Sequence, residues 1–158
     1  MITVHFIDTS VLLNILEIPG RSQSRKRILQ EMKDFTEAGD KFILPLATII
    51  ETGNHIAHIN EGNMRRDCAE RLSITIKKVL SDTLPWAYNK GEISDDDLWK
   101  IAEGFPHYAQ QQNMGLGDLS ILTEYLRYKN KHKRHFRVKL WSLDEHLCAF
   151  DGVDSIFY

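Results

Sequence analysis

Short, nearly continuous apolar runs alternate with longer amphipathic stretches along the chain. The runs at residues 2–7, 41–45 and 137–143 predict buried strands, and those at 84–88 and 154–158 predict shorter ones. Between them, apolar residues recur every three or four positions, as in helices with one buried face. Strands separated by helices predict an α/β fold with three layers, α/β/α, around a mainly parallel sheet of about four to five strands.

The amphipathic stretches begin and end at typical helix-capping residues. One follows Ser22 and ends at Gly39, and another covers residues 47–60. The helix at 64–80 has the clearest stripe, in which apolar residues recur every four positions: Met64, Cys68, Leu72, Ile76 and Leu80. The core is predicted to include all three tryptophans: Trp86, Trp99 and Trp141.

Length and composition indicate one globular domain that spans residues 1–158. Hydrophobic residues make up 42% of the chain and charged residues 27%, and the net charge of −2 provides no general attraction for nucleic acid. Cys68 and Cys148 form no CxxC pair, which favours a reduced, cytoplasmic protein. No apolar run is long enough to predict a membrane span or a signal peptide.

Four acidic residues occupy comparable places in this pattern. Asp8 follows the first strand, Glu51 lies in the first turn of the helix after the second strand, Asp118 opens a helix after a glycine turn, and Asp144 follows the strand at 137–143. Each can be explained as a helix-capping residue, Glu51 through a capping box with Thr48. However, parallel strands end at one edge of a sheet, where several carboxylates would repel one another. A divalent cation with oxygen ligands, Mg²⁺ or Mn²⁺, removes that repulsion.

The segments that carry these acids resemble, in order, the acidic motifs of PIN-domain nucleases: 6–13 (FIDTSVLL), 44–51 (LPLATIIE), 117–122 (GDLSIL) and 140–144 (LWSLD). The resemblance covers nearly the whole chain. It implies a PIN-like parallel sheet flanked by helices and a Mg²⁺- or Mn²⁺-dependent site that cleaves phosphodiesters, usually in RNA. Many small members are toxins of bacterial toxin–antitoxin pairs, so candidate partners are RNA, a small antitoxin protein and a second copy of the chain.

The resemblance also implies a role for each side chain. Asp8 and Asp118 are expected to bind the metal, and Asp144 to bind it directly or through water. Glu51 is expected to hold a metal-bound water or to act as general base. The hydroxyls of Ser10 and Ser142 are expected to orient water or phosphate. The chain is therefore predicted to be a metal-dependent endoribonuclease.

Other readings of the same residues stay open. The chain is alternatively a non-catalytic PIN-like module that binds RNA or serves as a scaffold, or a nuclease that acts on DNA. Glu51, His55 and His58 lie at helical spacing and allow a zinc site, although a third ligand is not evident. A haloacid-dehalogenase-type phosphatase would need a second aspartate where this chain has Ser10.

Residues 127–137 form the densest basic run of the chain and contain no acid. Lys131, Lys133 and Arg134 are the predicted RNA contacts, because a nuclease with an acidic site needs cations to bind a polyanion. The alternative is a solvated helix end, where cations favour the last turn. If that alternative holds, RNA would enter by another route, past four cations in an earlier segment of the chain: Arg21, Arg25, Lys26 and Arg27.

Overall fold

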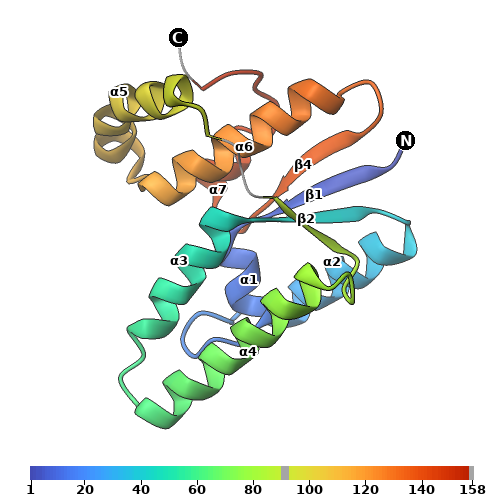
Figure 1. The fold of residues 1–158 in the computed structure, drawn as a ribbon, viewed down its shortest axis with the longest axis vertical. Helices are drawn as coiled ribbons and strands as arrows, with labels where there is room; N and C mark the ends of the chain where they lie inside the picture. The colour runs from blue at the N-terminus through green and yellow to red at the C-terminus, as the bar shows by residue number, and fades with distance from the viewer. Residues whose placement is uncertain (90–92, 157–158) are drawn as a thin grey trace.

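A computed structural model of the chain describes residues 1–89 and 93–156. Four parallel strands form one sheet in the order β3-β2-β1-β4 (Figure 1). The strands are β1 (Thr3–Ile7), β2 (Lys41–Pro45), β3 (Trp86–Asn89) and β4 (Arg137–Trp141). The sheet and the helices on both of its faces confirm the predicted α/β/α fold class.

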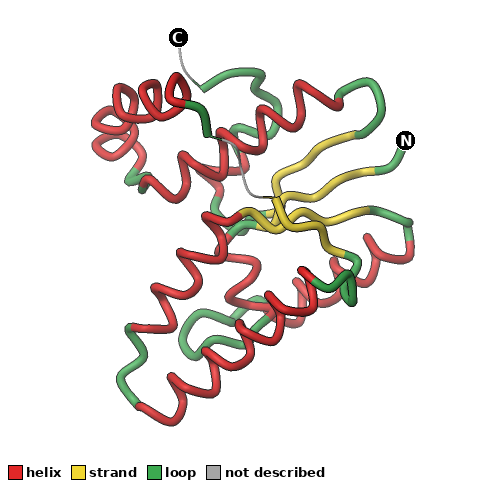
Figure 2. The backbone as a smooth tube through the Cα atoms, in the orientation of Figure 1, coloured by secondary structure: helices red, strands yellow, loops and turns green. Residues whose placement is uncertain are grey.

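Seven helices surround the sheet within the described residues: α1 (Thr9–Ile15), α2 (Arg25–Glu37), α3 (Leu46–Ala57), α4 (Gly62–Leu80), α5 (Asp95–Gln112), α6 (Leu116–His132) and α7 (Glu145–Cys148). Helices α5 and α6 cover one face, and α1, α2 and α4 cover the other (Figures 1 and 2). Helix α3 follows β2 and packs against α1, α4 and α6, so it joins the two helical layers.

The alternation of side chains along the strands divides the core in two. Val4 and Phe6 of β1 face α6, where the Phe6 ring packs edge-on against Tyr125 and Tyr128. Ile7 of β1 belongs to the cluster on the other face, with the first helices of the chain. Both faces of the central strands are therefore buried, which is why these strands read as continuous apolar runs.

Strand register makes the two edges of the sheet distinct. β1 pairs with β4 from Thr3 opposite Arg137 to Ile7 opposite Trp141. We call the side where the strands begin the amino edge and the side where they end, at Ile7, Pro45 and Trp141, the carboxyl edge. Because β1 and β4 end level, the residues that follow Ile7 and Trp141 emerge side by side.

Two predicted apolar contacts and one predicted strand are wrong. Residues 154–156 do not form a strand, and residues 157–158 lie outside the described part. In α4, Cys68 and Leu72 are buried, but Met64 and Leu80 are 42% and 60% exposed. A four-residue spacing drifts by about 40° per step around a helix of 3.6 residues per turn, so the ends of the stripe leave the core.

Trp99 is also not a core residue, since 68% of its surface is exposed, whereas Trp86 and Trp141 are buried as predicted. Trp99 precedes the buried Ile101 by two positions in α5 and therefore lies on the opposite side of that helix. The described part of the chain contains no helix with both the length and the hydrophobicity needed to cross a membrane.

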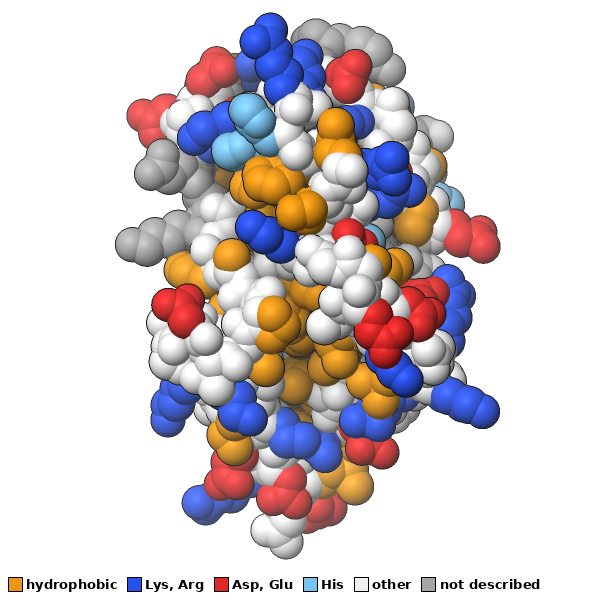
Figure 3. Space-filling view, turned by 90° about the vertical axis from the view of Figure 1, so that its right-hand side faces the viewer, with side chains coloured by type: hydrophobic (Ala, Val, Ile, Leu, Met, Phe, Trp, Pro, Cys, Tyr) orange, Lys and Arg blue, Asp and Glu red, His pale blue; other side chains and the backbone are white. Residues whose placement is uncertain are grey.

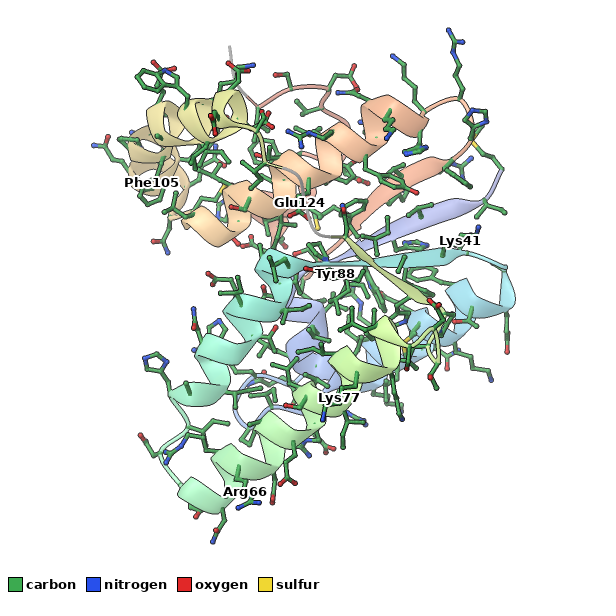
Figure 4. The ribbon with its side chains drawn as sticks, viewed as in Figure 1. Lys41, Arg66, Lys77, Tyr88, Phe105 and Glu124 are labelled. Atoms are coloured by element: carbon green, nitrogen blue, oxygen red, sulfur yellow. The ribbon has the colours of Figure 1, made fainter. Side chains whose placement is uncertain are left out.

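Glu124 is an acid inside the core, carried by α6 (Figure 4). It is 6% exposed, and no described residue donates a hydrogen bond to its Oε2. Burial raises the pKa of its carboxyl to about 7, because the charged form is poorly solvated there.

Glu124→Gln should therefore stabilise the protein in a pH-dependent way. The folded-state pKa lies above the unfolded one, so the wild type loses stability as the pH rises from about 4.5 through about 7. The variant should be more stable by up to roughly 3 kcal/mol at pH 8.5 and by little at pH 4.5. Urea unfolding at both pH values measures this, with the exposed Glu103→Gln as control; an equal effect at both would contradict it.

Candidate active site

The predicted site residues lie where the chain leaves β1 and β4 at the carboxyl edge. These strands are neighbours although most of the chain lies between them, so the direction of strand succession reverses here. Ligands of open α/β sheets bind in the crevice at such a switch point, outside the carboxyl ends of the strands. Asp8 directly follows β1, and Ser142 directly follows β4.

Asp8 is buried, with 2% of its surface exposed, and it is the N-cap of α1. Its Oδ2 accepts hydrogen bonds from the hydroxyls of Ser10 (2.8 Å) and Ser142 (2.7 Å) and from the Ser10 amide (3.3 Å). Its Oδ1 is buried and has no hydrogen-bond partner among the described residues. Asp8 thus has one oxygen held by three hydrogen bonds and one buried oxygen that no described residue engages.

The two serine hydroxyls join α1 to the turn after β4. Ser10 Oγ accepts a hydrogen bond from the Leu143 amide, and Ser142 Oγ accepts one from the Asp144 amide, each at 2.9 Å. Both hydroxyls donate to Asp8 Oδ2, and their predicted role in orienting water or phosphate stays a prediction. The serines therefore position the carboxylate and the chain that leads to Asp144.

Glu51 lies in the second turn of α3, not in its first turn as predicted, because α3 begins at Leu46. The predicted capping box is absent: the N-cap is Pro45, and the Thr48 hydroxyl donates to the carbonyl of Ile7 instead (2.8 Å). This bond anchors α3 beside the end of β1. No hydrogen bond to the Glu51 carboxylate is found within the described residues.

Gly117 brings the start of α6 against Glu51. A Cβ atom at Gly117 would lie 2.6 Å from Cδ and Oε1 of Glu51, which is closer than non-bonded atoms approach. The sequence had indicated Gly117 only as part of a turn. A glycine inside a helix, where alanine is favoured by about 1 kcal/mol, was the sequence feature that could have revealed this close approach.

Asp118 follows in the first turn of α6, and its Oδ2 accepts a hydrogen bond from the Gly115 amide (3.1 Å). Burial raises the pKa of Asp118 to about 6, and the negative charges of Asp8, Asp144 and Glu51 act in the same direction, against the Gly115 amide, which lowers it. The other three predicted acids therefore lie within electrostatic range of Asp118.

Asp144 is the N-cap of α7, and its Oδ1 accepts a hydrogen bond from the His146 amide (2.8 Å). Asp8, Asp118 and Asp144 thus each give one oxygen to the backbone at the start of a helix. Each carboxylate keeps a second oxygen that has no such bond. Helix capping and ion binding are therefore compatible at all three positions.

The donor set fits a hard divalent cation better than zinc. It consists of carboxylate oxygens, including the buried and unpartnered Oδ1 of Asp8. The carboxylates lie at the same edge of the sheet and interact electrostatically. However, in the described ranges no three His, Cys, Asp or Glu side chains are arranged around a common point that could hold a metal ion. For the zinc alternative, His58 Nδ1 lies 2.6 Å from the Asn54 carbonyl, and no third ligand joins Glu51 and His55.

The predicted RNA contacts lie at the other edge of the sheet. Helix α6 runs against the direction of the strands, so Lys131 is about 20 Å along the helix from Asp118. Arg137 begins β4 beside Thr3, and Lys41 at the start of β2 lies over the Phe136 ring (Figure 4). Figure 3 looks onto this amino edge and shows Lys, Arg and His side chains gathered in its upper part. The structure does not bring the run together with the carboxylates.

A groove of about 430 Å³ lies between α2 and α4, lined by hydrophobic residues such as Met32, Ile74 and Trp86. Hydrophobic side chains gather in a hollow on the lower half of the face in Figure 3. None of the four acids lines this groove.

The sequence matches no protein-family model and no curated protein. The likeness to PIN-domain nucleases thus depends on the four motifs that carry Asp8, Glu51, Asp118 and Asp144. Membership of that family stays a prediction.

Asp118→Asn should stabilise the metal-free protein at high pH. The wild-type carboxyl has a folded pKa near 6, above 3.8, so its contribution to stability is complete below about pH 4 and is lost as the pH rises through about 6. The asparagine oxygen can still accept from the Gly115 amide, which preserves the cap. Urea unfolding in EDTA at pH 4 and pH 8 should show a gain only at pH 8. A gain of the same size at both would remove the electrostatic explanation.

Gly117→Ala should slow the reaction without lowering the stability of the fold. Alanine favours the helix, so stability should be unchanged or increase by up to about 1 kcal/mol. The new Cβ must displace the Glu51 side chain, so any reaction that uses Glu51 should slow by roughly tenfold or more. Thermal unfolding and RNA cleavage measure the two effects, and Gly62→Ala, whose added Cβ approaches only the end of the Arg65 side chain, at 3.7 Å, is the control. Full activity of Gly117→Ala would contradict a role for this contact.

Proposed function

We propose that the chain is a ribonuclease of the PIN type that hydrolyses phosphodiesters with Mg²⁺ or Mn²⁺. The main support is the convergence of four carboxylates at the carboxyl edge, where Asp8 keeps one buried oxygen without a hydrogen bond from any described residue. Carboxylates placed together in this way repel one another, and the raised pKa of Asp118 reflects part of that cost. A structural role alone would not require the acids to gather.

Asp8, Asp118 and Asp144 would hold the metal through the oxygens that do not cap helices. When bound, the metal lowers the pKa of a water molecule and offsets negative charge on the phosphate. The serine hydroxyls fix which oxygen of Asp8 is presented, because both donate to Oδ2.

Glu51 is suited to the role of general base. No described residue engages its carboxylate in a hydrogen bond, whereas the three aspartates each cap a helix. Its carboxylate would accept a proton from the attacking water. The water oxygen forms a new bond to phosphorus while the bond to the leaving oxygen breaks, and the leaving oxygen takes up a proton from solvent.

Asp8→Asn and Asp118→Asn should each lower metal-dependent RNA cleavage at least about a hundredfold, because each removes a ligand charge. The measurement is cleavage of a mixed RNA pool with Mg²⁺ or Mn²⁺, and with EDTA. Metal binding by calorimetry should weaken in parallel, and Asp96→Asn, at an exposed acid of α5 paired with Lys100, is the matched control.

Three results would contradict the proposal. Cleavage that persists in EDTA would exclude the metal. Binding of RNA without cleavage would favour the non-catalytic module, and cleavage of single-stranded DNA but not RNA would favour a nuclease that acts on DNA.

A further inference from the structure

Helix α2 begins beside α1, the helix that Asp8 caps. Buried Asn14 holds the two helices together: its Nδ2 donates to the Ser10 carbonyl (2.8 Å), and its Oδ1 accepts from the Ser24 amide (3.0 Å). Residues 18–30 contain no acid, and their cations are Arg21, Arg25, Lys26 and Arg27. This second basic segment therefore borders the carboxyl edge, unlike the run at 127–137.

Arg27 is tied to Asp8 by a chain of three hydrogen bonds. Its Nε donates to Oε1 of Glu31 (2.8 Å), Oε2 of Glu31 accepts from the Trp141 indole (2.8 Å), and the Trp141 carbonyl accepts from the Asp8 amide (3.0 Å). The Arg27 side chain is nevertheless 67% exposed, so the rest of its guanidinium faces solvent. The Nε atom of Arg27 is thus held by Glu31, while most of the side chain is exposed to solvent.

The charge of Arg27 reaches the α7 side of the site. Burial raises the pKa of the Cys148 thiol, and the charges of Asp151, Asp144 and Asp8 raise it further, whereas Arg27 lowers it. Arg27 and the acids of the site therefore act on the same thiol, in opposite directions.

Arg21 lies in the loop before α2, on the α3 side of the site. It is exposed. Burial lowers the pKa of His55, the positive charge of Arg21 lowers it further, and Glu51 acts in the opposite direction. His55 is one turn after Glu51 in α3, so Arg21 and Glu51 act on the same imidazole.

We infer that Arg21 and Arg27 bind phosphate groups of an RNA strand that crosses the carboxyl edge. This inference rests on the proposed ribonuclease function and names the surface that holds its substrate. The four carboxylates repel a polyanion, so attraction must come from cations beside them. Guanidinium groups suit this role because they bind phosphate through paired N–H donors.

The helix dipole does not explain the basic segment. Cations near the start of a helix oppose its dipole, and the first turn of α2 contains no acid to compensate. The alternative contacts, Lys131, Lys133 and Arg134, are about 20 Å from Asp118 along α6 and lie at the amino edge.

The test is RNA affinity across a salt series, measured by fluorescence anisotropy with a labelled single-stranded RNA in Ca²⁺ to suppress cleavage. Arg21→Ala with Arg27→Ala should weaken binding about tenfold or more at low salt and reduce the log–log salt slope by about 1.4, or 0.7 for each lost phosphate contact. Metal affinity should not change, because neither side chain is a ligand. Arg27→Lys, which keeps the charge, should retain most of the slope.

Arg66→Ala is the matched control. Arg66 donates from Nε to Oε1 of Glu70 four residues later (3.0 Å), as Arg27 does to Glu31, but it lies near the beginning of α4 (Figure 4). Its loss should leave the slope unchanged, and thermal unfolding should show that all variants are folded.

An unchanged slope in the double variant, with a wild type that binds and cleaves RNA, would overturn the inference and leave the proposed function standing. A slope lost only when Lys131, Lys133 and Arg134 are replaced by Ala would place RNA at the amino edge and would also overturn it. A wild type that neither binds RNA nor cleaves it with metal would overturn both proposals.

Discussion

The burial of the Asp8 carboxylate is the constraint on which the rest of the site depends. A charged group that is 2% exposed needs hydrogen-bond donors, and here they come from two distant parts of the chain, Ser10 in α1 and Ser142 after β4. The Ser142 bond requires that β4 end beside β1, as the strand order places it. Thr48 adds a third segment by its bond to the carbonyl of Ile7. The same carboxylate therefore connects segments that the sequence separates by more than a hundred residues.

Capping and ion binding are usually treated as competing explanations of an acid at the start of a helix. A carboxylate has two oxygens, and in this protein only one oxygen of each of Asp8, Asp118 and Asp144 accepts a hydrogen bond from the backbone. The amide bonds orient each carboxylate, and the remaining oxygen is directed by that orientation rather than by a free rotation. The backbone at each helix start therefore fixes the carboxylate that the proposed cation would meet.

The sequence could predict the features that depend on local pattern. Apolar runs located the four strands, and the acids after β1 and β4 indicated the candidate site, because both are properties of neighbouring residues. The Gly117–Glu51 contact depends on how α3 packs against α6, and the two serine bonds depend on strand order, so neither is visible in the local pattern. The place of Lys131 was predictable in principle, since a helix between parallel strands carries its end to the edge opposite its start. The exposure of Trp99 similarly follows from the helical phase of Ile101.

The three capping bonds also have a consequence for motion. The amide hydrogens of Ser10, Gly115 and His146 are bonded to carboxylate oxygens of one electrostatic cluster rather than to the carbonyls of a helix or strand. A change in charge anywhere in the cluster alters the strength of all three bonds together. The first turns of α1, α6 and α7 should therefore open and close as a coupled unit, and their exchange with solvent hydrogen should rise and fall in concert although they are distant in sequence.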